Sequence, residues 1–151
     1  MQRFLLLLLL LTSGALRAQD APAFAFTFNH LALSVKDVNR SADFYKKTLQ
    51  LPEIVNRTKL ANIRWLSLGQ GQELHLISGV KEPVTVNKGV HLALATARFD
   101  DFVRGLDALK IPYSDWPGAA HTVNHRDDGV RQIYFQDPDG YWIEVNDAKQ
   151  P

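Results

Sequence analysis

The sequence predicts an α+β fold built from two similar halves, each with a strand, a helix and then a meander of strands. The tetrapeptide His-Leu-Ala-Leu at residues 30–33 recurs 61 residues later, at residues 91–94. Each copy leads into a segment whose apolar residues recur every three or four positions, as in a helix packed on one face. Each helical segment is followed by two apolar runs around a glycine-containing turn, which is the pattern of a β-hairpin.

The first 18 residues have the pattern of a secretory signal peptide. Arg3 supplies a positive charge, residues 4–11 are a run of eight apolar residues, and small residues lead up to Ala18. A transmembrane helix needs about 20 apolar residues, so this run is too short to span a bilayer. We expect cleavage after Ala18, and export to the periplasm or the exterior without a stable membrane anchor. An uncleaved anchor is the alternative.

Composition excludes several functional classes. The chain has 151 residues, of which 46% are hydrophobic and 22% charged, so it can bury the core of one domain. Its 17 basic and 16 acidic residues give a net charge of +1, which excludes the basic footprint of a nucleic-acid-binding protein. The chain has no cysteine, which excludes disulfides, thiolate zinc sites and cysteine nucleophiles.

In the first half, the alternation of Phe24, Phe26 and Phe28 predicts that the first strand begins before the repeated tetrapeptide. Residues 38–49 then carry apolar side chains at helical spacing, and Asp37 is placed to cap the helix N-terminus.

The hairpin of this half runs from Trp65 to Ile77 around a turn at residues 69–71. The second half repeats this order: residues 99–109 have helical spacing, with Asp100 and Asp101 near the start. Residues 132–145 form a hairpin around the turn at residues 137–140, and residues 80–88 connect the halves.

The repeat also matches residues that can bind a metal. His30 corresponds to His91 in the two tetrapeptides. Aligning the turn glycines of the two hairpins places His75 opposite Glu144, each four residues after its glycine. The same alignment places Glu73 opposite a tryptophan, which favours His75 as the candidate. The sequence leaves open whether Glu73 faces the metal instead.

Three imidazoles and one carboxylate suit a first-row divalent ion. Side chains alternate between the faces of a strand, so each matched pair can point to one side of its half. A single strand histidine between leucines is usually a core residue without a metal, and this is the alternative for each taken alone. Their occurrence at matched positions favours a metal site formed by His30, His75, His91 and Glu144.

Five segments of this chain resemble the vicinal oxygen chelate superfamily, which includes glyoxalase I, extradiol dioxygenases, and fosfomycin- and bleomycin-resistance proteins. The most specific is Asp-Pro-Asp-Gly-Tyr-Trp-Ile-Glu at 137–144, and the others are residues 29–35, 41–45, 73–76 and 89–93. The resemblance implies paired βαβββ modules forming a cupped mixed sheet. The domain would span residues 27–147 after an N-terminal extension at 19–26, with module one at 27–79 and module two at 89–147.

The resemblance also implies a site. His30, His91 and Glu144 fall on positions that ligate a metal in many members, and His75 falls where glyoxalase I carries a glutamate. The expected cofactor is a divalent ion: zinc, nickel, manganese or iron. The expected partners are a small-molecule substrate and a second copy of the chain, since two-module members that resemble glyoxalase I are usually dimers with shared sites.

The activity implied by this resemblance is that of a metal-dependent, glyoxalase-like lyase or isomerase acting on a small oxygen-chelating substrate. Glu144 is the candidate base of such a reaction. One alternative is an extradiol-type dioxygenase or a thiol transferase, since two histidines and one carboxylate also suit iron(II). The other is a small-molecule-binding protein of the resistance type, without catalysis.

Overall fold

The computed structural model describes residues 24–82 and 84–149. The expected signal peptide, residues 1–18, lies outside the described residues. Within the described ranges, no helix has the length and apolar character needed to cross a membrane.

Module one has the order strand, helix and three strands. The outer strand β1 runs parallel to β4, whereas β4 with β3 and β3 with β2 are antiparallel, giving the sheet order β1-β4-β3-β2. The elements are β1 (His30–Val35), α1 (Val38–Thr48), β2 (Glu53–Ile54), β3 (Ile63–Gly69) and β4 (Gln72–Ser78).

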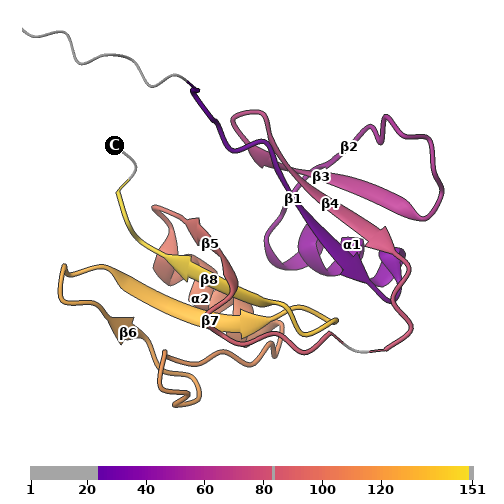
Figure 1. Ribbon diagram of the computed structural model, residues 1–151. Coiled ribbons are helices and arrows are strands. Elements are labelled where there is room, and N and C mark those ends of the chain that lie inside the picture. The colour runs from indigo at the N-terminus through magenta and orange to yellow at the C-terminus, as the bar shows by residue number, and fades with distance from the viewer. Residues whose placement is uncertain (1–23, 83, 150–151) are drawn as a thin grey trace, which may run out of the picture.

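Module two repeats this topology, with the sheet order β5-β8-β7-β6 and β5 parallel to β8 (Figure 1). The two equivalent mixed sheets confirm the predicted α+β fold and its internal repeat. The short strands β2 and β6 were not located by the sequence pattern. The elements are β5 (His91–Ala95), α2 (Phe99–Ala108), β6 (Asn124–His125), β7 (Arg131–Gln136) and β8 (Trp142–Asn146).

The predicted cap of α1 is confirmed. The Asp37 carboxylate accepts the backbone N–H groups of Asn39 at 2.9 Å and Arg40 at 3.1 Å, so it satisfies two of the donors that a helix N-terminus leaves unpaired. At the start of α2, Asp100 and Asp101 lie in the first turn, where the helix dipole favours negative charge.

The predicted start of the first strand is wrong. β1 begins at His30, and Phe24, Phe26 and Phe28 are exposed outside any strand. The partner strand β4 explains the difference: it begins at Gln72, and the first paired residues are His30 and Glu73. Residues before His30 therefore extend beyond the end of the partner strand. They have no strand to pair with, although their apolar residues alternate.

The turn between β7 and β8 joins module two to module one. Tyr45 on α1 donates its hydroxyl to the buried Asp137 carboxylate at 2.9 Å. Asp139 accepts the Ser41 hydroxyl at 2.6 Å and the Lys36 backbone N–H at 2.8 Å. The two carboxylates of the Asp-Pro-Asp-Gly turn thus fix the start of α1 against the second sheet.

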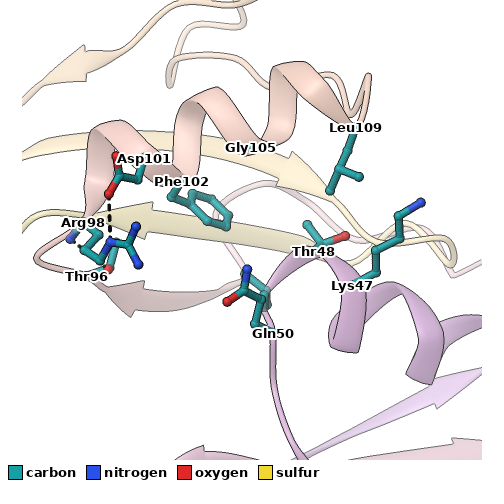
Figure 2. Close-up of a pocket in the computed structure, with 10 residues that line it drawn as sticks. Lys47, Thr48, Gln50, Thr96, Arg98, Asp101, Phe102, Gly105 and Leu109 are labelled. Atoms are coloured by element: carbon teal, nitrogen blue, oxygen red, sulfur yellow. Dashed lines mark hydrogen bonds and ion pairs between the residues drawn. The ribbon is translucent and has the colours of Figure 1, made fainter.

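A phenylalanine of β7 links the helices of the two modules. Phe135 on β7 contacts Phe44 of α1 and Phe102 of α2, with ring centroids 6.4 Å and 5.9 Å apart, so the cores of the modules are continuous. A pocket of about 270 Å³ lies between the C-terminal end of α1 and α2 (Figure 2). It is lined by residues such as Lys47 and Leu109, and none of the candidate metal ligands lines it.

Candidate metal centre

Strand pairing places the four candidate ligands at equivalent positions. His30 lies opposite Glu73 and Ala32 opposite His75 in the first sheet. In the second, His91 lies opposite Trp142, and Ala93 lies opposite Glu144 two residues further along the strands. His75 therefore corresponds to Glu144 in the observed register, as the alignment of the turn glycines predicted.

Glu144 and His91 form a close pair in module two. His91 Nε2 lies 3.2 Å from Oε2 of Glu144. His91 Nδ1 lies 2.9 Å from the Lys88 carbonyl oxygen, which can only accept, so Nδ1 carries the proton. The Nε2 lone pair of the neutral ring then faces a carboxylate oxygen. Two such acceptors at this distance need a cation between them, either a proton or a metal ion.

Glu144 is held from behind by two further donors. The Tyr134 hydroxyl donates to Oε2 at 2.7 Å, and the Asn146 side-chain amide donates to Oε1 at 2.6 Å. Burial, and then the hydrogen bond to Glu144, raise the pKa of Tyr134, so Tyr134 stays a protonated donor at neutral pH. Glu144 itself is buried. These contacts orient the carboxylate, as partners of metal-binding carboxylates do.

Lys88 fixes the loop beside this pair. Its ammonium donates to the Ser114 hydroxyl at 3.1 Å and to the carbonyl oxygen of Trp116 at 3.2 Å, and it lies 5.1 Å from the centre of the Tyr134 ring. The Trp116 ring also meets the His91 ring edge-on, with centroids 6.4 Å apart. Lys88 thus holds Trp116 and the His91 imidazole in place at once.

The pair in module one has a different geometry. The rings of His30 and His75 are stacked, with centroids 4.2 Å apart and planes 15° from parallel. Trp65 covers the other face of His75 at 4.1 Å. His75 Nε2 lies 2.7 Å from Glu73, whose other oxygen accepts Arg57 at 2.9 Å. The hydrogen bond to His75, and then that to Arg57, lower the pKa of Glu73.

The module-two pair fits a divalent metal ion. Bonds of about 2.1 Å in a tetrahedral or octahedral arrangement place adjacent donor atoms roughly 3.0–3.4 Å apart. The 3.2 Å between His91 Nε2 and Glu144 Oε2 lies in this range. The donor types and the supporting hydrogen bonds fit as well.

The module-one pair fits a metal ion through one ring only. An imidazole lone pair lies in the plane of its ring, so a shared ion would have to lie near both planes. Between rings stacked at 4.2 Å, a midway ion would be about 2 Å out of each plane, which is nearly a whole bond length. His30 is the better donor, because its Nδ1 contacts Asn29 at 2.6 Å, leaving Nε2 to bind, as in His91.

One chain does not bring all four candidates together. Across residues 24–82 and 84–149, no three His, Cys, Asp or Glu side chains lie close enough to hold one ion. Each sheet contributes one pair. The four-ligand set therefore stays a prediction. It requires another arrangement of modules than that within one chain, and a different orientation of the stacked His30 and His75 rings.

Several residues of the site escaped sequence reasoning. Tyr134 had a usable signal: it lies opposite Glu144 across the hairpin, as Trp65 lies opposite His75, so counting back from the turn identifies both. Lys88 and Arg57 lie outside the strands, and no spacing rule locates them.

Comparisons with known proteins agree with the two-module fold. Residues 27–145 match the Glyoxalase/Bleomycin resistance protein/Dioxygenase superfamily. The chain is 26% identical over 168 residues to a lactoylglutathione lyase of Pseudomonas putida, covering 89% of this chain and 92% of that protein.

Two solved structures share the fold. A glyoxalase/dioxygenase from Nostoc punctiforme is 25% identical, with a TM-score of 0.68 over 90% of this chain and 100% of that chain. The oxidase ChaP-H2 is 20% identical, with a TM-score of 0.65 over 83% of this chain and 96% of that chain.

Proposed function

Because the chain belongs to the Glyoxalase/Bleomycin resistance protein/Dioxygenase superfamily, we propose that it is a divalent-metal-dependent enzyme of the glyoxalase-like lyase or isomerase type. Its substrate is a small molecule with two adjacent oxygens. The observation that carries the proposal is the 3.2 Å His91–Glu144 pair, in which two acceptor atoms face each other and each side chain is held by its own hydrogen bonds.

We propose that a homodimer completes the site. His30 of one subunit lies beside His91 and Glu144 of the partner subunit, and the converse pairing forms a second site. The separation of the two pairs within one chain supports this assembly. So do the exposed apolar side chains Phe24, Phe28 and Val90 near the starts of β1 and β5, which a second subunit would cover.

In this site, His91, Glu144 and His30 of the partner subunit would hold a divalent ion, which would supply positive charge to stabilise an oxyanion on the substrate. Glu144 accepts the proton that leaves the substrate carbon. Tyr134 and Asn146 keep the two carboxylate oxygens in place while this occurs. His75, held by Glu73 and Trp65, keeps the His30 ring in a fixed position.

The proposal is tested by titrating the purified protein with zinc, nickel, manganese and iron(II). The expected result is one ion per subunit, with affinity reduced tenfold or more in His91→Ala and in Glu144→Ala. Unchanged affinity in both variants contradicts the metal site.

Mixing two defective variants tests the shared site. In a dimer formed from His30→Ala and His91→Ala chains, one site carries both defects and the other carries neither. Subunit exchange therefore restores about one quarter of the wild-type metal capacity for statistical pairing. If each site lies within one chain, mixing restores none. Light scattering of each variant provides the control for assembly.

An extradiol-type dioxygenase is the second candidate. The stacking of His30 on His75 favours it, because a site with one histidine from module one has two histidines and one carboxylate. This donor set holds iron(II) in oxygenases and leaves positions open. Thiol transfer and ligand binding without catalysis are the further alternatives. Turnover assays with and without a thiol cosubstrate distinguish them.

We also propose that the protein is exported after cleavage at Ala18. The run of eight apolar residues followed by small residues supports this. N-terminal sequencing of the protein from the exported fraction of its own cells tests it, with Gln19 expected as the first residue.

A further inference from the structure

A cavity of about 280 Å³ lies in the seam between the two modules. One wall comes from the edge strand β1, and the opposite wall from the edge strand β5 and from β8. Residues of the connector between the modules complete it. Its apolar lining includes Leu31, Leu33, Val86, Val90, Leu92 and Ile143.

The lining carries no acidic, lysine or arginine side chain. Two tyrosines contribute to it, but the Tyr45 hydroxyl donates to Asp137 at 2.9 Å and the Tyr141 hydroxyl to the Ser34 carbonyl at 3.0 Å. Both hydroxyls are therefore engaged outside the cavity. The occupant that suits these walls is an uncharged apolar group, because a charged or strongly polar group would lose its hydration without a partner.

His91 connects this cavity to the candidate metal centre. His91 is one of the residues that line the cavity, and its Nε2 faces Glu144 at 3.2 Å. Ala32, exposed on β1, lines the opposite wall and leaves the cavity accessible. A molecule whose oxygens lie at His91 and Glu144 can therefore place a substituent in the seam.

We propose that the seam cavity binds the apolar substituent of the substrate. This inference rests on the proposed function, since it assigns the substrate of that same site. Ligand pockets usually enclose about 300–1,000 Å³, so the cavity suits a short alkyl chain or one phenyl ring. The substrate class is then a small compound with two adjacent oxygens and one apolar substituent.

The first experiment needs no metal. Metal-free wild-type protein is titrated with toluene while the methyl signals of Leu31, Leu92 and Val90 are followed by NMR. We expect saturable shifts of these signals. Ala32→Leu, which fills the cavity from β1, abolishes them. Ala61→Leu, the same substitution at an exposed alanine outside the lining, leaves them unchanged.

The second experiment uses two hydroxamates, which chelate a metal through adjacent oxygens. Acetohydroxamate has a methyl substituent and hexanohydroxamate a five-carbon chain. We expect zinc-loaded wild-type protein to bind hexanohydroxamate about tenfold or more tightly than acetohydroxamate, because its additional methylenes would be buried in the cavity. Ala32→Leu reduces this ratio to near one and changes acetohydroxamate affinity less than twofold, and Ala61→Leu keeps the wild-type ratio.

A second filling variant, Val86→Phe, provides an independent test in case Ala32→Leu misfolds, and circular dichroism checks the folding of both variants. The cavity proposal is overturned if toluene causes no saturable shift in wild type, or if both folded filling variants bind toluene as wild type does. Equal binding of the two hydroxamates by metal-loaded protein also overturns it. Failure to bind metal overturns the proposed function instead, and the metal-free titration still decides the cavity.

Discussion

The carboxylate of Glu144 meets His91 Nε2 at 3.2 Å, and each of these two side chains is fixed from its far side. The Lys88 carbonyl sets the tautomer of His91, whereas the Tyr134 hydroxyl sets the orientation of Glu144. Neither side chain can turn away without breaking a hydrogen bond. The pair is therefore held in one geometry, so the supporting residues can be tested separately from His91 and Glu144.

Tyr134→Phe removes a donor to Glu144 while keeping the ring in place. We expect divalent metal affinity to fall by roughly 10–100-fold, as is typical when the partner of a ligand is lost. Isothermal titration measures it. Tyr141→Phe is the matched control, because its hydroxyl donates to the Ser34 carbonyl and makes no contact with Glu144. Equal affinity in Tyr134→Phe and wild type would show that Glu144 does not depend on this hydrogen bond.

Substitutions of the two stacked histidines of module one should reduce metal affinity by different amounts. His30→Ala removes the donor whose Nε2 is available, and we expect metal affinity to fall tenfold or more. His75→Ala removes a ring held by Glu73 and Trp65, and we expect a loss of only a few-fold. Titration of both variants with zinc gives the comparison. The reverse order of effects would make His75 the ligand.

Sequence reasoning placed the candidate ligands at equivalent strand positions because these positions depend on strand periodicity and on repeat symmetry. The correspondence of His75 with Glu144 follows from counting residues after each turn, and the strand register reproduces it. Glycine turns fix hairpin register, so this count carries through to three dimensions.

The arrangement of side chains within the site could not be predicted from the sequence pattern. The stack of His30 on His75 depends on side-chain torsions set by Trp65, which comes from another strand. The separation of the two pairs depends on how the modules dock, and this is fixed by contacts such as Tyr45 with Asp137, 92 residues apart. Neither relation has a local signal.

Tyr45→Phe tests the connection between the modules. It leaves the buried Asp137 carboxylate without one of its donors, and we expect the free energy of unfolding to fall by about 1–3 kcal/mol at neutral pH. Urea denaturation measures it. Burial raises the pKa of Asp137 and the Tyr45 hydrogen bond lowers it, so the loss should shrink as pH falls and Asp137 is protonated. A loss that does not depend on pH would contradict this explanation. Tyr141→Phe removes an inter-module hydrogen bond to a carbonyl and not to a carboxylate, so it is the control for the pH dependence.

The ion pairs of Glu53 stabilise the fold, and this stabilisation is lost in acid. Its hydrogen bonds to Arg64, with a smaller contribution from Lys46, lower its pKa from 4.5 to about 2, against the opposing effect of burial. The folded state thus binds this proton more weakly than the unfolded state. The stabilisation is complete above about pH 4.5 and is lost as pH falls towards 2.

Glu53→Gln should therefore flatten the fall in stability between these pH values. Urea midpoints measured across this range give the slope, with Glu82→Gln, at an exposed residue of the connector, as the control. A slope as steep as that of wild type would show that the ion pairs of Glu53 do not persist in solution.

Exchange of the metal separates the two candidate reactions. A lyase or isomerase needs the charge of the ion and no change in its oxidation state, so zinc, nickel, cobalt and manganese should each support turnover at graded rates. Oxygen should then have no effect. An extradiol-type oxygenase should work only with iron(II) or manganese(II) and should consume oxygen. We expect the first pattern, because Glu144 is positioned both to bind the ion and to accept a proton. Oxygen uptake in stoichiometric ratio to an added catechol, supported by iron alone and abolished in Glu144→Gln, would instead establish the oxygenase.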